Sequence, residues 1–153
     1  MFFLPARSRP NPTSQTPFWD DLYLCTVIKV DDAQPHYITG YTPHGSMMTA
    51  HHMLMYGCSE PGSDQRVWNC GEMAGSSSDF EKGPVCSQRS AEDVSRIIYA
   101  WAKDAPALNL PEGVGFKVGG DTGVSYLVLQ VHYMHKLDHK DNSGVTVHST
   151  TEP

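Results

Sequence analysis

The sequence predicts an all-β domain, an antiparallel β-sandwich or jelly roll stapled by two disulfides. Short apolar segments rich in β-branched and aromatic residues are separated by turns that contain Gly and Pro, without alternating helices. The 153 residues include four cysteines, and a chain of this length can bury a sizeable core as one domain. We expect residues 1–17, rich in Pro, Ser, Arg and Asn, to form a flexible arm and residues 18–153 to form the domain.

Five segments carry the strand signal, because each is apolar and is bounded by turn residues. Residues 90–104 combine helical spacing of apolar positions with the composition of a buried strand, so both interpretations stay open. The glycine-rich stretch 110–123 is expected to form turns that lead into the next strand. The predicted strands cover residues 21–30, 36–41, 47–58, 125–135 and 144–150.

The four cysteines, Cys25, Cys58, Cys70 and Cys86, stand apart without a CxxC pair. Their even number fits two disulfides better than a zinc knuckle, although spacing alone permits three pairings. The alternative is four reduced, buried cysteines in a cytosolic protein. We expect disulfides, and therefore a secreted or secretory-pathway protein, although the opening residues have too short an apolar core for a convincing signal peptide.

Charge and motifs exclude several classes of function. The formal charge is -6, with no long block of either sign, so we expect no nucleic-acid surface. No apolar run approaches the roughly 20 residues that a membrane helix needs. The sequence contains no GxSxG, P-loop or HExxH motif that would indicate another chemistry.

The stretch TAHHMLMYGC, residues 49–58, places His51 and His52 side by side in apolar strand sequence. Buried imidazoles need partners, which are hydrogen bonds or a metal. Neighbours in a strand point to opposite faces, so this pair can share a metal only if the backbone twists or bulges or different ring nitrogens are used. His132 interrupts a second apolar run and is the candidate third ligand. Otherwise each histidine is a core or rim residue bonded to backbone.

Three neutral imidazoles without a thiolate or carboxylate suit copper or zinc, and intrinsic affinity favours copper. Copper would allow one-electron transfer, whereas zinc with a bound water would form a hydrolytic or hydratase site. These residues alone leave the choice of metal open.

Four blocks of sequence resemble a known family: MTAHHMLMYGC, IIYAWAKDAPALNLPEGVGFKVGGDTG, YLVLQVHYMH and HKDNSGVTVH. They resemble the first copper domain of the peptidylglycine α-hydroxylating monooxygenases, within the copper type II, ascorbate-dependent monooxygenase family. The resemblance runs from about residue 20 to the C-terminus. The related dopamine β-monooxygenases share the plan, but these blocks look like the peptide-amidating branch.

The resemblance implies that His51, His52 and His132 bind the electron-transfer copper of such an enzyme. It places Tyr23 close to that copper and Gln130 on an electron route, with ordinary strand packing as the alternative for both. It also implies a pairing for each cysteine, Cys25 with Cys70 and Cys58 with Cys86.

Other positions have no ligand role in the resemblance. Asn142 stands where the family has a cysteine of a further disulfide, so we expect that disulfide to be missing here. Met53 is expected in the core and His148 in a structural role. The remaining histidines are expected in turns or at the surface, namely His36, His44, His135 and His139.

In the family a second domain follows, in which a His-x-His pair and a methionine bind the copper where oxygen and a glycine-extended peptide react. This sequence contains no His-x-His. We therefore expect the electron-transfer half of the enzyme, which binds one copper, accepts electrons that come from ascorbate, depends on a second copper domain and is inactive alone. The alternatives are a stand-alone copper carrier or redox module and, with less support, a three-histidine zinc hydrolase.

Overall fold

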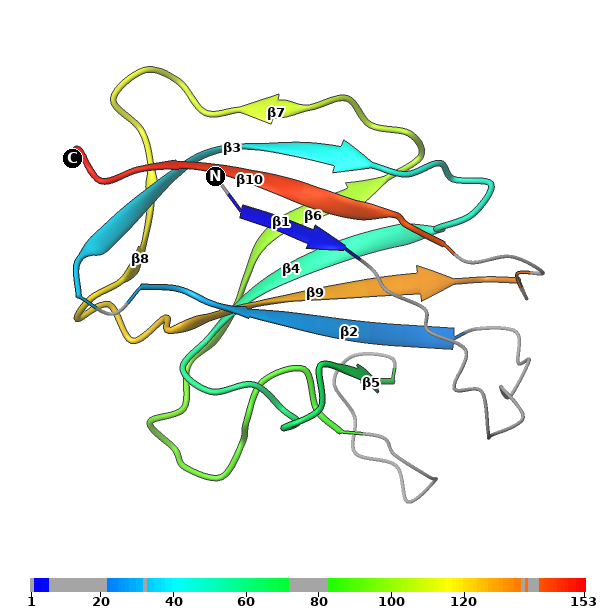
Figure 1. Ribbon diagram of the computed structural model, residues 1–153, viewed down its shortest axis with the longest axis horizontal. Coiled ribbons are helices and arrows are strands. Elements are labelled where there is room, and N and C mark those ends of the chain that lie inside the picture. Colours follow the sequence, from blue (N-terminus) through cyan, green and yellow to red (C-terminus); the bar gives the residue numbers. More distant parts are fainter. Residues whose placement is uncertain (1, 6–21, 32, 72–82, 136, 138–140) are drawn as a thin grey trace.

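The computed structural model describes residues 2–5, 22–31, 33–71, 83–135, 137 and 141–153. Within these ranges the chain forms β-strands and no helix, as predicted, and every strand pair is antiparallel (Figure 1). None of the described elements is a helix long and apolar enough to cross a membrane. The strands are β1 (Phe2–Pro5), β2 (Leu22–Lys29), β3 (Pro35–His44), β4 (His52–Cys58), β5 (Val67–Asn69), β6 (Ser95–Ala102), β7 (Leu108–Asn109), β8 (Phe116–Gly119), β9 (Tyr126–Tyr133) and β10 (Gly144–Thr150).

The strands form two sheets. The first sheet has the order β1-β10-β3-β7, and β8 also pairs with β3. The second sheet has the order β5-β2-β9-β4-β6. In Figure 1, β1, β3 and β10 cross the upper part of the view, and β9, β2 and β5 lie below them. The predicted antiparallel sandwich is confirmed, and the five predicted strands correspond to β2, β3, β4, β9 and β10. The prediction for 47–58 was wrong over residues 47–51, which precede β4 as a turn and a bend.

Strands also form where the sequence predicted turns or an arm. Part of the expected turn segment 110–123 is β8, which pairs with β3 and ends where Gly119 and Gly120 adopt φ angles of 73° and 53°. Within the expected arm 1–17, residues 2–5 form β1 along β10, and the remainder lies outside the described residues. The open segment 90–104 contains β6, the edge strand beside β4.

The main core lies between the sheets. Alternation along β9 sends Leu127, Leu129, Val131 and Tyr133 into it, because every second side chain of a strand points to the same face. The first sheet contributes buried residues from β3, β8 and β10 to the same core. Met53 lies here with no exposed surface, as predicted.

The opposite face of the second sheet carries a smaller apolar cluster, which we call the outer cluster. It includes both disulfides, Cys25–Cys70 and Cys58–Cys86, with Cα–Cα distances of 5.8 and 5.4 Å. The pairing is the one that the family resemblance implied, and the alternative of four reduced cysteines is wrong. The outer cluster consists of Cys25, Tyr56, Cys58, Trp68, Cys70, Val85, Cys86 and Val128.

A buried carboxylate anchors the connection from β9 to β10, which passes from one sheet to the other. The Tyr133 hydroxyl donates to Oδ2 of Asp141 at 2.6 Å, and the backbone N–H and hydroxyl of Ser143 donate to Oδ1 at 3.1 and 2.8 Å. Burial, followed by this bond to Asp141, raises the pKa of the Tyr133 phenol. The phenol therefore remains neutral and donates its hydrogen bond. We call the Asp141 carboxylate with these hydrogen bonds the Asp141 anchor.

Candidate metal centre

Three aromatic side chains form a row across the outer face of the second sheet. The register places Tyr23 of β2 opposite His132 of β9, and His132 opposite His52 of β4. Residues directly opposite one another in antiparallel strands have Cβ atoms about 5 Å apart on one face. The sheet register therefore brings two histidines from distant parts of the sequence into contact.

His51 joins the row from outside the strand. β4 begins at His52, and residue 51 forms a bend after a turn in which the Ala50 N–H donates to the Ser46 carbonyl at 2.8 Å. The His51 N–H then donates to the carbonyl of His132 at 2.8 Å. Because His51 lacks strand conformation, the alternation of faces does not separate it from His52. The backbone distortion that the sequence required for adjacent histidines to share a metal is therefore a bend at His51.

The three imidazoles converge. The Nδ1 atom of His52 lies 3.2 Å from Nδ1 of His51 and 3.3 Å from Nδ1 of His132. Ring centroids are 4.8 to 5.4 Å apart, and one ring nitrogen from each histidine lies within 4.8 Å of the others. We call this group the histidine cluster. Among the residues that the structure describes, no other group of three histidine, cysteine or acidic side chains converges this way.

The donor set fits one copper or zinc ion. Imidazole nitrogens bind such ions at about 2.0–2.1 Å, so two nitrogens on one ion are separated by about 3 Å. The two short Nδ1 separations agree with this value. A neutral imidazole that carries its proton on Nε2 offers a lone pair on Nδ1. The histidine cluster could therefore hold one metal ion without losing a proton.

Exposure increases along the histidine cluster. His132 is 6% exposed, His52 is partly buried and His51 is exposed, so the cluster is more open on the His51 side. Tyr23 stacks on the buried ring of His132, with a centroid separation of 4.2 Å and an interplanar angle of 7°. This stacking restricts rotation of the His132 ring. It places Tyr23 in contact with the cluster.

Gln130 lies next to this row on the same face of β9. Its side chain is buried, and Nε2 donates to the Gly71 carbonyl at 2.9 Å and lies 3.6 Å from the Cys70 sulfur. These contacts tie β9 to the chain that follows the Cys25–Cys70 disulfide. Gln130 therefore supports the strand that carries His132.

Two histidines of the first sheet contact threonines. Nε2 of His44 lies 2.7 Å from the Thr146 hydroxyl, and Nε2 of His148 lies 2.7 Å from the Thr42 hydroxyl. The structural role expected for His148 agrees with this contact. His44 is exposed, as expected for a surface residue.

The remaining described histidines are not members of the histidine cluster. His36 is a partly buried residue of β3, with Nε2 4.0 Å from Oδ2 of Asp31, so the expectation of a turn or surface position was only partly right. His135 is exposed, as expected. The expectation for His139 falls outside the described residues.

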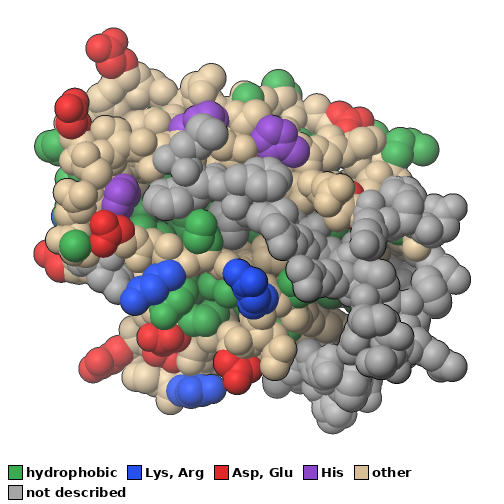
Figure 2. All heavy atoms as spheres, viewed as in Figure 1, with side chains coloured by type: hydrophobic (Ala, Val, Ile, Leu, Met, Phe, Trp, Pro, Cys, Tyr) green, Lys and Arg blue, Asp and Glu red, His purple; other side chains and the backbone are tan. Residues whose placement is uncertain are grey.

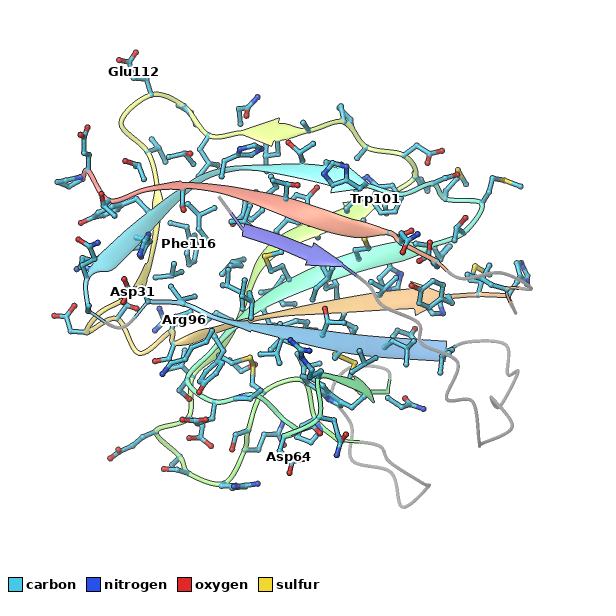
Figure 3. The ribbon with its side chains drawn as sticks, viewed as in Figure 1. Asp31, Asp64, Arg96, Trp101, Glu112 and Phe116 are labelled. Atoms are coloured by element: carbon cyan, nitrogen blue, oxygen red, sulfur yellow. A yellow bond between two sulfur atoms is a disulfide. The ribbon has the colours of Figure 1, made fainter. Side chains whose placement is uncertain are left out.

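Sequence reasoning missed the residues that hold the turn before His51. Oδ1 of Asp104 accepts a hydrogen bond from the Met47 N–H at 2.8 Å, which ties this turn to the end of β6. Trp101, labelled in Figure 3, is buried, and its indole N–H donates to the Ala105 carbonyl at 2.9 Å. These bonds fix the chain after β6, but no local motif in the sequence signals them.

Comparison with known proteins identifies the family. Residues 9–140 match the model of the N-terminal domain of the copper type II ascorbate-dependent monooxygenases. Peptidyl-glycine alpha-amidating monooxygenase B of Xenopus laevis is 43% identical over 141 residues, and peptidylglycine alpha-amidating monooxygenase of Rattus norvegicus is 39% identical over 142. Each match covers 90% of this chain.

A more distant relative, dopamine beta-hydroxylase of Canis lupus familiaris, is 27% identical over 146 residues and 91% of this chain. The chain spans only 14%, 13% and 21% of the lengths of the frog, rat and dog relatives. The match to the family model nevertheless covers most of the chain. The chain therefore belongs to the copper type II ascorbate-dependent monooxygenase family, and it matches the N-terminal domain of that family.

Proposed function

We propose that this chain is the electron-transfer copper domain of a peptide-amidating monooxygenase, in which His51, His52 and His132 bind one copper ion. The observation that carries the proposal is the convergence of three imidazoles, in which Nδ1 of His52 lies 3.2 and 3.3 Å from Nδ1 of the other two. Family membership supports copper over zinc, since its description includes copper and ascorbate. The three-histidine zinc hydrolase therefore has no specific observation in its favour.

Copper held by these imidazoles would supply one-electron transfer, because imidazole ligands suit both Cu(I) and Cu(II). The chain's own contribution is to hold the ligands. Tyr23 fixes the orientation of the His132 ring by stacking, and the bend at His51 adds a third nitrogen from an exposed position. The open His51 side would be the side from which an electron donor approaches.

We propose that ascorbate is the reductant and that a second copper domain receives the electron. In that domain a peptide with a C-terminal glycine would be hydroxylated. This extension is supported by the resemblance to the peptide-amidating branch and by the similarity to the frog and rat enzymes. The isolated chain would bind copper without hydroxylating peptides.

Gln130 and Tyr23 would support the copper ligands without binding copper themselves. Gln130 holds β9 against the disulfide-bonded segment, and Tyr23 packs directly on His132. Their positions on the same sheet face as His132 support a place for both beside the electron route. Two disulfides also support a secreted or secretory-pathway location, because such bonds persist in oxidising compartments.

A copper titration with X-ray absorption tests the ligand set. We expect one copper per chain with about three imidazole ligands, since the histidine cluster supplies three nitrogens. The His132→Ala variant should lose this site, whereas the control His148→Ala should retain it because His148 contacts Thr42 on the other sheet. Competition with equimolar zinc tests the choice of metal. No copper binding, or binding unaffected by His132→Ala, would contradict the proposal.

An activity assay tests the assignment as one half of an enzyme. The copper-loaded chain with ascorbate, oxygen and a glycine-extended peptide should give no product above the background of free copper. Conversion above that background that disappears in His132→Ala would overturn the electron-transfer assignment. Binding without any redox change in the presence of ascorbate would instead favour a copper carrier.

A further inference from the structure

Exposed methionines lie beside the histidine cluster. Met47 and Met48 are 47% and 84% exposed and precede His51 by four and three residues. Met134 is 39% exposed and follows His132 by two residues. No other methionine of the described residues is exposed. The remaining described methionines lie in the core between the sheets and have no exposed surface, namely Met53 and Met55.

The backbone brings these methionines to one end of the second sheet. The His51 N–H donates to the His132 carbonyl at 2.8 Å, so the turn with Met47 and Met48 meets the end of β9 that leads to Met134. A residue advances the chain by at most about 3.6 Å. Each methionine Cα therefore lies no more than about 14 Å from the Cα of a clustered histidine.

The turn itself is fixed by hydrogen bonds. The Met47 N–H donates to Oδ1 of Asp104 at 2.8 Å, and the Met48 N–H donates to the Ser46 hydroxyl at 3.1 Å. The two methionine side chains therefore extend toward solvent from an ordered backbone. An apolar side chain that is 84% exposed adds little to the core, so its packing gives no reason for methionine at this position.

Thioether chemistry offers a reason. Methionine sulfur is neutral, polarisable and soft, and it binds Cu(I) in preference to hard divalent ions. Imidazole accepts both oxidation states of copper. Thioethers beside an imidazole cluster would therefore offer Cu(I) a soft, exposed site next to nitrogen ligands that also accept it.

We propose that Met47, Met48 and Met134 form a thioether site that takes up Cu(I) and passes it to the histidine cluster. The passage is a ligand exchange in which Cu–S bonds break and Cu–N bonds form. Copper remains Cu(I), the thioethers leave as neutral groups, and imidazoles protonated on Nε2 bind through Nδ1 without releasing a proton. The transfer rests on the proposed function of the histidine cluster, but binding at the sulfurs does not.

Anaerobic Cu(I) titration with X-ray absorption at the copper edge tests the sulfur site. The wild-type chain should take up Cu(I) beyond the histidine cluster, and the additional copper should show sulfur neighbours. The triple variant Met47→Leu, Met48→Leu, Met134→Leu keeps apolar side chains of similar size and should lose that additional copper. The matched control Met55→Leu removes one buried sulfur and should behave as wild type.

Two further measurements separate this inference from the proposed function. In His132→Ala the sulfur-bound Cu(I) should persist although the nitrogen site is lost. In the triple variant the nitrogen site should reach the same final occupancy but fill more slowly from a Cu(I)–bicinchoninate donor. A wild-type chain without sulfur neighbours, or a triple variant with unchanged uptake and loading rate, would overturn the inference.

Discussion

Histidines lie on the outward faces of both sheets, but their partners differ. In the first sheet, His44 and His148 each place Nε2 2.7 Å from a threonine hydroxyl on the neighbouring strand. In the second sheet, the imidazoles of the histidine cluster contact one another, with Nδ1 separations of 3.2 and 3.3 Å. A hydroxyl can donate or accept, so it complements either neutral tautomer, whereas ring nitrogens that face one another are complemented by a shared proton or by a shared metal ion.

The comparison indicates that the cross-strand neighbour, more than the histidine itself, determines which role is available. The register of β3 and β10 places Thr146 opposite Thr42. Each threonine is therefore diagonal to a histidine of the neighbouring strand, which accounts for the two histidine–threonine contacts. Figure 2 shows histidine side chains over the upper part of the molecule, and in Figure 1 the first sheet lies in that part of the same view. Hydrogen bonds to threonine therefore account for His44 and His148 without a metal.

The largest expected effect comes from removing the disulfide beside the histidine cluster. Cys25 and Cys70 are 45 residues apart, and Cys25→Ala with Cys70→Ala should lower the free energy of unfolding by about 4 kcal/mol through the entropy of the unfolded chain. Copper affinity should fall as well, because Gln130 links this disulfide segment to β9. Denaturant unfolding and a copper titration measure the two effects.

The second disulfide supplies the control. Cys58 and Cys86 are 28 residues apart, so Cys58→Ala with Cys86→Ala should also cost about 4 kcal/mol. Cys58 ends β4 at the opposite end from His52, so copper affinity should change little. Equal losses of copper affinity in both double variants would break the comparison, since the site would then depend on global stability alone.

A smaller effect is expected at Gln130. Gln130→Leu keeps the volume but leaves the Gly71 carbonyl without this donor, which should cost about 1–3 kcal/mol of folding free energy. Thermal unfolding measures this loss. A wild-type unfolding temperature would show that Gln130 does not support β9.

Tyr23→Leu should have a still smaller effect on stability. Stacking of aromatic rings is worth about 0.5–1.5 kcal/mol beyond burial, and Tyr23 stacks on His132. If the stacking orients a copper ligand, copper affinity should fall by up to about tenfold at this energy. Tyr23→Phe retains the ring and should restore affinity; failure of phenylalanine to do so would assign the effect to the hydroxyl.

The smallest effect on copper binding is expected for variants of the first sheet. His148→Ala removes one partly exposed hydrogen bond to Thr42 and should cost about 0.5–1.5 kcal/mol. Thr42→Val should give a similar loss by thermal unfolding. Neither variant should change copper binding, and a loss of copper in either would erase the distinction between the two groups of histidines.

The long strands were predictable because their sequences alternate and are rich in β-branched residues, but the edge strands were not. β6 shows why. A register shift opposite Met55 and Tyr56 pairs them with Tyr99 and Ile97, so Ile98 is an extra residue. The bulge interrupts the two-residue period and gives the apolar positions of this segment a helical spacing. Only the neighbouring β4 resolves the ambiguity.

The histidine cluster was predictable in composition but not in geometry. His51, His52 and His132 are conspicuous because they interrupt apolar strand sequence. The opposition of His52 and His132 depends on the register of β4 with β9, which no local pattern specifies. The bend at His51 depends on the preceding turn and its bond to Asp104, which comes from a distant part of the chain.

The Asp141 anchor and the disulfides respond differently to a reducing agent. Both disulfides belong to the outer cluster on one face of the second sheet, whereas the crossing between sheets is held by bonds from Tyr133 and Ser143 to a carboxylate. A thiol reductant acts on the cross-links of the outer face and has no bond to cleave in this crossing. Reducing conditions would therefore act directly on the face of the second sheet that carries the histidine cluster, and on no bond of this crossing.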